Sequence, residues 1–158
     1  MKRVLIFGRG GSGKSTAAAK LGEITGLPTV ELDKIFWQPG LQPMGRELWV
    51  KTQQELIKGE GWILDGDLGP YDAMEVRLAA ADTIILLNFS LIRCAWRALR
   101  RGPERNDFWR WLIAYRRTSL PALMQAFNQF APHAHLHVIR SARQLRRFVA
   151  EAQRSVAK

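Results

Sequence analysis

The glycine-rich segment Gly8–Ser15 constrains the fold of this chain more than any other feature. Its residues, Gly-Arg-Gly-Gly-Ser-Gly-Lys-Ser, fit the pattern G-x-x-x-x-G-K-S/T, in which glycines leave backbone N–H groups free to surround a phosphate. In that pattern Lys14 reaches the β- and γ-phosphates of a nucleoside triphosphate, and the Ser15 hydroxyl binds Mg²⁺. The pattern requires a buried strand before it and a helix after it, and the flanking residues predict both.

The loop and the start of the following helix supply the predicted nucleotide contacts. They are Gly8, Gly10, Gly11, Ser12, Gly13, Lys14, Ser15 and Thr16, and Lys14 is also predicted to act in catalysis. The first six loop residues also fit G-x-G-x-x-G, the dinucleotide-binding pattern, and Glu31 or Asp33 lies where that fold places its ribose-binding acid. A dinucleotide site has no need of an ammonium and a hydroxyl at the helix start. Triphosphate binding is therefore favoured, and dinucleotide binding stays open as an alternative.

Apolar runs and helix-forming segments alternate along the rest of the chain. The apolar runs predict five strands, at 2–7, 29–32, 62–64, 83–89 and 135–139. Helices are predicted at 14–23, 46–58, 74–80, 91–101 and 142–157, and a longer one begins with Asp107 as its N-cap, is kinked or restarted at Pro121 and ends near Phe130. Such β–α crossovers imply a parallel sheet covered on both sides. We expect an α/β P-loop NTPase three-layer sandwich with a five-stranded parallel sheet, in a single domain over residues 1–158.

Composition and the lengths of the apolar runs predict the cellular compartment of the protein. The chain has 158 residues, of which 47% are hydrophobic, and its one cysteine, Cys94, cannot form an internal disulfide. Only four apolar residues follow the basic start before Gly8, too few for a secretory signal, and no apolar run is long enough to span a membrane. These features predict a cytoplasmic protein with no membrane segment.

Positive charge is concentrated in the second half of the chain. Residues 91–158 contain 14 Lys and Arg against 3 Asp and Glu, whereas residues 1–90 contain 10 against 11. This asymmetry predicts a polyanionic partner, which on this ground alone is a nucleoside triphosphate, a nucleic acid or an anionic membrane surface. A solvated basic face explains the asymmetry as well.

Part of this charge forms a stripe of arginines. Arg93, Arg97, Arg100 and Arg101 recur at helical spacing, and Arg105 continues the stripe in the following loop. Guanidinium groups stabilise the charge that spreads over the phosphoryl oxygens during phosphoryl transfer. An arginine from Arg97, Arg100, Arg101 or Arg105 is therefore predicted to be catalytic. The alternative is a solvated or nucleic-acid-binding face.

Two aspartates follow apolar strands. Asp65 comes directly after Trp62–Leu64, and Asp33 follows the strand at 29–32. The carboxyl ends of parallel strands meet at one edge of the sheet, so both carboxylates should lie near the phosphate loop. Asp65 is predicted to hold Mg²⁺ directly or through water, and Asp33 to accept or orient the proton of an acceptor hydroxyl. Each is alternatively an N-cap or turn aspartate.

Together with the loop, the segments Glu31–Trp37, Gly61–Asp67 and Arg77–Asp82 resemble the adenylate kinase-like P-loop proteins called DNA topology modulation proteins (FlaR-related). The resemblance covers most of residues 1–101 and returns at Val138–Ser141. It implies a nucleoside monophosphate kinase-like fold that uses ATP and Mg²⁺. It also implies a metal contact for Asp65, acceptor contacts for Asp33 and Arg77, and an adenine contact for Arg140.

The chain departs from this family at three places. The usual Gly-Asn-Tyr-Gly after the third strand reads Gly66-Asp67-Leu68-Gly69, and the usual Leu-Asp-x-Pro after the fourth strand reads Leu87-Asn88-Phe89-Ser90. The lid between Arg101 and Asp107 is short. We expect a kinase-like protein that transfers the γ-phosphoryl group of ATP to a small hydroxyl or phosphate acceptor. The alternative is a nucleotide-dependent regulator or weak ATPase whose basic C-terminal half binds nucleic acid. The sequence specifies neither the acceptor nor the oligomeric state.

Overall fold

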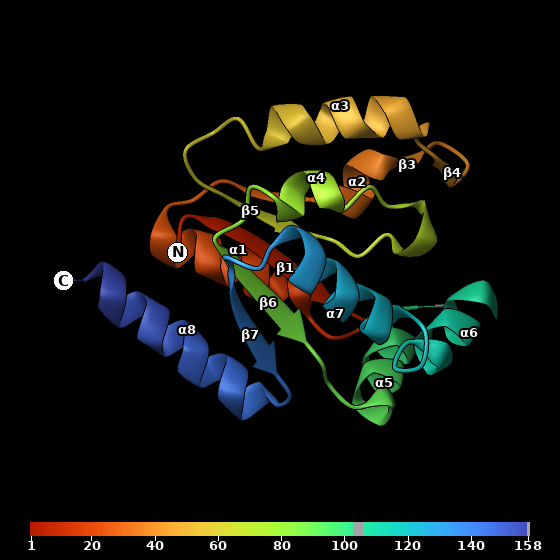
Figure 1. Ribbon diagram of the computed structural model, residues 1–158. Coiled ribbons are helices and arrows are strands. Elements are labelled where there is room, and N and C mark those ends of the chain that lie inside the picture. The colour runs from red at the N-terminus through yellow and green to blue at the C-terminus, as the bar shows by residue number, and fades with distance from the viewer. Residues whose placement is uncertain (103–105, 158) are drawn as a thin grey trace.

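A five-stranded parallel sheet forms the centre of the molecule (Figure 1), in a computed structural model that describes residues 1–102 and 106–157. The spatial order of the strands is β2-β5-β1-β6-β7. Their bounds are β1 (Arg3–Gly8), β2 (Thr29–Glu31), β5 (Trp62–Asp65), β6 (Thr83–Leu87) and β7 (His135–Ile139). The order confirms the predicted parallel sheet. It differs from the dinucleotide-binding fold, in which the second strand pairs with the first, because β5 separates β2 from β1 here.

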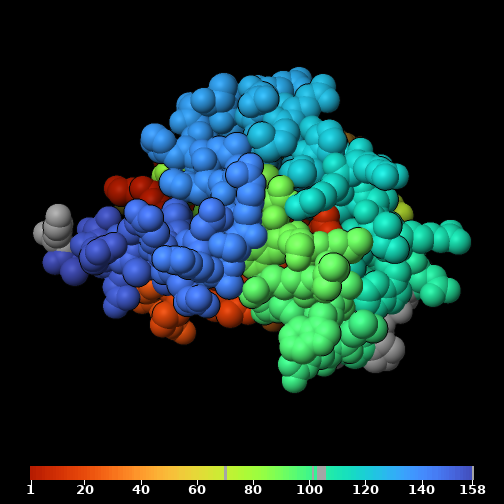
Figure 2. All heavy atoms as spheres, turned by 90° about the horizontal axis from the view of Figure 1, so that it is seen from below, coloured from red at the N-terminus to blue at the C-terminus, as the bar shows by residue number. Residues whose placement is uncertain are grey.

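Helices cover both faces of the sheet. Their bounds are α1 (Lys14–Thr25), α2 (Leu32–Phe36), α3 (Arg46–Leu56), α4 (Glu75–Leu78), α5 (Leu91–Arg101), α6 (Asn106–Ala114), α7 (Ser119–Phe130) and α8 (Ala142–Val156). Helices α1 and α8 pack on one face, and α3, α4 and α7 pack on the other. Seen from below in Figure 2, helices α5 to α8 cover most of the molecule, so the basic half of the chain forms this surface.

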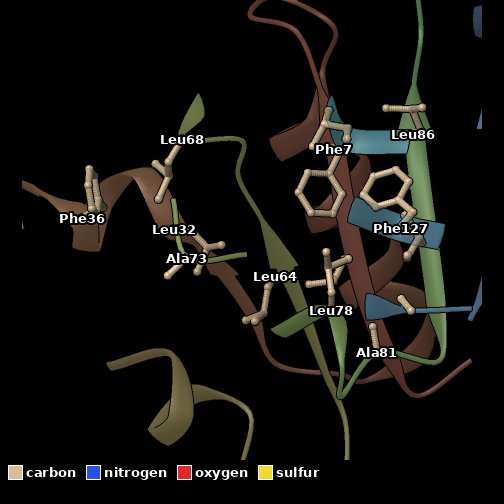
Figure 3. Close-up of a cluster of buried hydrophobic side chains, with 14 of the residues drawn as sticks. Phe7, Leu32, Phe36, Leu64, Leu68, Ala73, Leu78, Ala81, Leu86 and Phe127 are labelled. Carbon is tan, nitrogen blue, oxygen red and sulfur yellow. The ribbon is translucent and has the colours of Figure 1, made fainter. Parts of the chain in front are cut away.

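Strand β1 shows why the sheet needs both helical layers. Val4 and Ile6 are fully buried toward the α1 and α8 side, whereas Leu5 and Phe7 are fully buried toward the α3, α4 and α7 side. A strand that buries both of its faces must be apolar at every position, which is what the predicted run at 2–7 indicated. Figure 3 shows Phe7 and Phe127 in contact within the second of these layers.

One expectation about the helices was wrong, and one was confirmed. Asp107 is not an N-cap, since it lies in the first turn of α6, which begins at Asn106. The predicted restart near Pro121 is present: α6 ends at Ala114, and α7 runs from Ser119 to Phe130. Pro121 lies in the first turn of α7, where a helix has no need of the missing N–H.

A short helix and a hairpin that the sequence did not indicate follow β2. Helix α2 has five residues, and the hairpin pairs β3 (Trp37–Gln38) with β4 (Gln42–Pro43). Elements this short contain too few residues to show a hydrophobic period.

The predicted short lid includes residues 103–105, which lie outside the described residues. No helix in the described ranges is long and apolar enough to cross a membrane.

Substitution of Phe127 by Ala tests the packing of α7 on the sheet. The Phe127 side chain is 3% exposed, and its ring centroid lies 5.0 Å from that of Phe7. Removing a buried ring costs about 3–5 kcal/mol of unfolding free energy, measurable by urea denaturation. Phe130→Ala, in the same helix but 37% exposed, is the matched control and should cost less than about 1 kcal/mol. Equal losses in the two variants would contradict the observed packing.

Candidate functional site

The glycine-rich loop connects β1 to α1 and is packed closely against two later helices. Gly11 and Gly13 have φ angles of +74° and +93°, which L side chains rarely adopt. A Cβ on Gly11 would overlap the carbonyl oxygen of Cys94 in α5, and a Cβ on Gly10 would overlap the Phe108 ring in α6. The glycines therefore serve both the backbone conformation of the loop and the close approach of α5 and α6.

Lys14 closes the loop from the helix side. Its Nζ donates a hydrogen bond to the carbonyl oxygen of Gly8 at 2.8 Å and a longer one to that of Arg9 at 3.5 Å. The ammonium also lines the neighbouring cavity. A phosphate entering the loop would compete for this ammonium with two neutral carbonyl groups, which bind it less strongly than an anion does.

Ser15 and Asp65 meet at the carboxyl edge of the sheet, as predicted from strand order. Ser15 Oγ donates a 2.6 Å hydrogen bond to Asp65 Oδ2. Asp65 ends β5 and is 2% exposed. Burial raises the pKa of its carboxyl above the ordinary value, while Lys14 and the Ser15 hydrogen bond act in the opposite direction.

The Ser15 and Asp65 oxygens fit Mg²⁺. Asp65 Oδ1 is buried and has no hydrogen-bond partner within the described part of the chain, so it is available to a cation. Hydroxyl and carboxylate oxygens are the ligands that Mg²⁺ prefers, and it commonly takes one or two protein ligands together with substrate phosphates. In residues 1–102 and 106–157, no three His, Cys, Asp or Glu side chains form a group that could hold a metal by itself.

A large cavity of about 1450 Å³ opens beside the loop. The loop and the start of α1 form its floor, through Gly10, Gly11, Gly13, Lys14, Ser15 and Thr16. One side, here called the acidic wall, consists of Glu31, Asp33, Trp37, Leu41, Pro43, Asp67, Leu68, Gly69 and Tyr71. The other side, here called the arginine wall, consists of Arg93, Trp96, Arg97, Arg100, Asp107, Phe108 and Trp111.

The arginine wall brings α5 to the loop. The Arg97 guanidinium is adjacent to Gly13, since its Nη1 lies 3.1 Å from where a Cβ of that glycine would be. Arg100 stacks over the Trp96 ring at 4.5 Å. Arg101, another of the predicted catalytic arginines, is the last residue of α5, and its side chain is not among the parts that the structure describes. Arg105 lies outside the described residues altogether.

Two aspartates of the acidic wall have raised pKa values. Asp33, in α2, is an exposed residue that lines the cavity, and loss of solvation of its carboxyl there raises the pKa despite the opposing charge of Lys14. Asp67 accepts hydrogen bonds from the Tyr115 hydroxyl at 3.1 Å and the Gly69 N–H at 3.2 Å. Burial raises the pKa of Asp67 as well.

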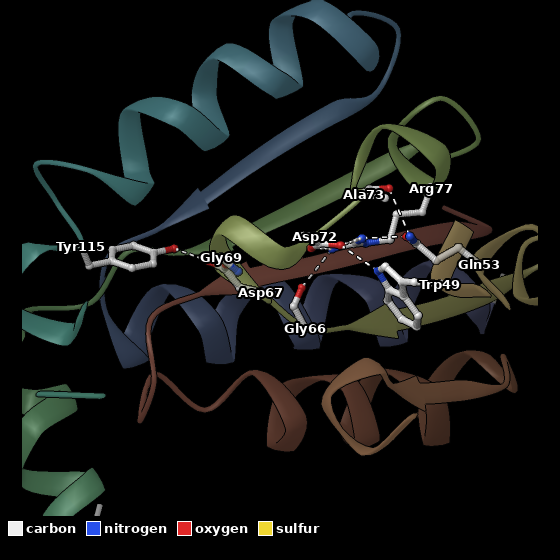
Figure 4. A network of polar contacts seen from close by, with 9 residues as sticks. All are labelled: Trp49, Gln53, Gly66, Asp67, Gly69, Asp72, Ala73, Arg77 and Tyr115. Atoms are coloured by element: carbon white, nitrogen blue, oxygen red, sulfur yellow. Dashed lines mark hydrogen bonds and ion pairs between the residues drawn. The ribbon is translucent and has the colours of Figure 1, made fainter. Parts of the chain in front are cut away.

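The structure does not bring Arg77 to the cavity. Its side chain is fully buried, and its Nη1 and Nη2 donate to the two carboxylate oxygens of Asp72 at 2.7 and 2.5 Å (Figure 4). It also donates to Gln53 at 2.8 Å and to the carbonyl oxygen of Gly66 at 3.4 Å. Arg77 therefore fixes both ends of the segment 66–72, which supplies part of the acidic wall, without contacting the cavity.

Arg140 also lies apart from the cavity. It is exposed, and its backbone N–H donates to Gln144 Oε1 at 2.7 Å at the start of α8. Its predicted contact with adenine stays a prediction.

Sequence reasoning did not identify several aromatic residues of the site. Trp37 and Tyr71 lie on the acidic wall with ring centroids 5.9 Å apart, and Phe108 and Trp111 lie over the loop. Phe108 and Trp111 have the helical spacing of core residues, and that spacing cannot distinguish a core contact from a cavity wall.

Substitution of Asp67 by Asn tests the electrostatics of the acidic wall. A carboxyl whose pKa is raised by folding lowers the free energy of unfolding as pH rises above its ordinary value of about 4. Asp67→Asn should therefore be more stable than the wild type at pH 7, and the difference should vanish at acid pH. Urea denaturation between pH 3 and 8 measures this.

Asp82 provides a control, because folding lowers the pKa of its carboxyl whereas it raises that of Asp67. Burial acts to raise its pKa, but hydrogen bonds from Thr83 Oγ1 and from the N–H groups of Arg3 and Lys2 outweigh burial and lower it. Asp82→Asn should be less stable than the wild type at pH 7, and this loss should disappear as pH falls through the lowered pKa. A destabilised Asp67→Asn at pH 7 would contradict the electrostatic account.

Comparison with known proteins identifies the fold. No family model matches the chain, and no curated protein matches it. It is similar to the solved structure of a shikimate kinase from Acinetobacter baumannii in complex with shikimate, with 15% identity, 99% of this chain and 93% of that chain covered, and a TM-score of 0.68. A sugar kinase from a Janibacter species is 19% identical, with 98% of this chain and 91% of that chain covered and a TM-score of 0.58. A gluconokinase from Sinorhizobium meliloti is 17% identical, with 99% of this chain and 91% of that chain covered and a TM-score of 0.57. The chain has the α/β fold of P-loop kinases.

Proposed function

We propose that this protein binds ATP with Mg²⁺ and transfers the γ-phosphoryl group to a small hydroxyl or phosphate acceptor. One observation carries the proposal. The phosphate loop, with Lys14 and Ser15, forms the floor of a cavity that has arginines on one side and carboxylates on the other, and Ser15 is hydrogen-bonded to the buried Asp65. Phosphoryl transfer requires positive groups around the phosphates and a carboxylate near the acceptor.

The loop would hold the triphosphate. Backbone N–H groups and the Lys14 ammonium bind the phosphate oxygens, and Lys14 leaves the Gly8 carbonyl to do so. Ser15 and Asp65 would hold Mg²⁺. Bound Mg²⁺ neutralises charge on the β- and γ-phosphates and aligns them. Arg97, next to Gly13, is the described arginine of the predicted catalytic set best placed to stabilise charge on the transferred group.

Asp33 would act on the acceptor. The acceptor oxygen forms a bond to the γ-phosphorus while the bond from that phosphorus to the bridging oxygen of ADP breaks, and ADP leaves with the electron pair. The proton of an acceptor hydroxyl passes to the Asp33 carboxylate. A raised pKa makes this carboxylate a better proton acceptor than an ordinary surface aspartate.

The structural neighbours and the sequence resemblance support this proposal. Shikimate and gluconate, the acceptors that two of the neighbours' names indicate, are hydroxyl compounds. We also propose that the chain is related to the DNA topology modulation proteins, on the basis of the loop and the segments after the second and third strands of the sheet.

The decisive experiment measures ADP release from ATP and Mg²⁺ with a panel of nucleosides, nucleoside monophosphates and small metabolites. Stimulation of ADP release by an acceptor, with a phosphorylated product in equal amount, supports the kinase proposal. ATP binding without stimulation by any acceptor would instead favour the regulator or weak ATPase.

Substitution of Lys14 by Ala tests the phosphate site directly. Losing a charge-assisted hydrogen bond costs about 1.5–3 kcal/mol, so affinity for ATP with Mg²⁺ should fall about 10- to 150-fold, measurable by calorimetry. Lys20→Ala removes an exposed lysine of the same helix that pairs with Glu23 and is the matched control. Unchanged nucleotide affinity in Lys14→Ala would remove the basis of the proposal.

Exposed arginines favour nucleic-acid binding as the second candidate. Arg143, Arg146 and Arg154 of α8 are exposed, and α8 forms part of the surface seen in Figure 2. If this surface binds a phosphate backbone, affinity for a DNA or RNA duplex should fall steeply, by about 10³-fold or more, between 50 and 200 mM salt. A flat salt dependence would leave the arginines as a solvated face.

A further inference from the structure

We infer that the acceptor is a hydroxyl compound that carries a protonated amine and no anionic group, such as an amino alcohol or an amino sugar. This inference rests on the proposed kinase function and names its substrate class. It comes from the different charges of the two cavity walls. The arginine wall and the loop carry positive groups suited to the triphosphate, so the acidic wall, with its carboxylates, is the part of the cavity left for the acceptor.

The acidic wall contains carboxylates without matching cations. Its charged residues are Glu31, Asp33 and Asp67, and no Lys or Arg is among the residues of this wall in the described chain. Glu31 pairs with Lys34 at 2.8 Å, but that ammonium is on an exposed side chain outside the large cavity. No cation of the wall therefore pairs with Asp33 or Asp67, and a cation bound there would stabilise the ionised form of carboxyls whose pKa values burial has raised.

The nearest other cations are already engaged. Arg77 is buried behind the wall in its bidentate pair with Asp72, and Arg46 pairs with Glu75 at 2.8 Å. Neither arginine lines the cavity. Lys14 is the positive group that acts on both Asp33 and Asp67, and a bound triphosphate would take up most of its charge.

An anionic acceptor would therefore meet like charge. A carboxylate or phosphate placed against Asp33 and Asp67 is repelled, and it finds no guanidinium fork on this wall with which to pair. A protonated amine beside Asp67 instead gains a carboxylate partner, and Asp33 remains to act on the acceptor hydroxyl.

Aromatic rings on the same wall strengthen the preference for an ammonium group. Trp37 and Tyr71 form an edge-to-face pair, with ring centroids 5.9 Å apart and an interplanar angle of 75°, and both line the cavity. Ring faces attract cations, most strongly for Trp. Aromatic faces beside carboxylates that no cation of the wall neutralises favour an ammonium group over a phosphate or carboxylate.

Kinetic comparison of matched acceptors tests the inference. The pairs are glucosamine with gluconate, and 2-amino-1,3-propanediol with glycerate, with glucose as a neutral reference and shikimate as a further anion. ADP release at saturating ATP and Mg²⁺ gives kcat/KM for each compound. We expect the amine of each pair to exceed the anion at least 10-fold, with phosphorylated amine as the product.

Two variants test the wall itself. Asp67→Asn and Trp37→Leu should each raise KM for the preferred amine several-fold and change KM for glucose much less. Glu75→Gln removes a carboxylate from the exposed pair with Arg46, outside the cavity, and should change neither value. Equal effects of all three variants would indicate a general loss of structure and overturn the inference.

The outcomes separate this inference from the proposed function. Preference for gluconate, glycerate or shikimate over the amines overturns the inference and leaves the kinase proposal intact. ATP binding with no stimulation by any amine overturns it as well. A chain that does not bind ATP at all refutes the proposed function, and this inference falls with it.

Discussion

The contact between the loop glycines and helices α5 and α6 determines how the site is built. Gly10 meets the Phe108 ring, and Gly11 meets the backbone of α5 at Cys94, with no room for a side chain at either glycine. This contact brings the second, basic half of the chain against the first, and it places Arg97 beside Gly13. The excess charge of residues 91–158 is thereby partly directed at the phosphate loop, whereas the arginines of α8 remain at the surface.

The opposite wall depends on a buried ion pair. Asp72 and Arg77 are both buried, and Arg77 also holds the Gly66 carbonyl and Gln53, so the segment 66–72 is tied to α3 and α4. Trp49 Nε1 adds a hydrogen bond to Asp72 at 3.3 Å. Removing one member of such a pair costs about 3–5 kcal/mol, because the other charge is left uncompensated. Arg77 thus acts on the cavity only through the segment that it anchors.

The parts of the site that could be predicted from the sequence are those that depend on residues close together in the chain. The loop, the strand before it and Asp65 at the end of β5 follow from glycine spacing and apolar runs, and strand order then brings Ser15 and Asp65 together. The burial of Arg77 depends on Asp72 and Gln53 folding around it, which no spacing rule reveals. The restart of the helix at α7 could be predicted from Pro121, since proline is favoured in the first turn of a helix.

The division of the cavity into two walls explains how one fold can serve different acceptors. The floor and the arginine wall come from β1, α1 and α5, whose positions follow from the loop and its close contacts. The acidic wall comes from α2, the β3–β4 hairpin and the segment after β5, which are short and connect elements of the central sheet. Substitutions in such connecting segments leave the sheet and loop unchanged. Under the proposed function, residues such as Trp37 and Asp67 can therefore change the preferred acceptor from an anion to an ammonium compound while phosphate binding is retained.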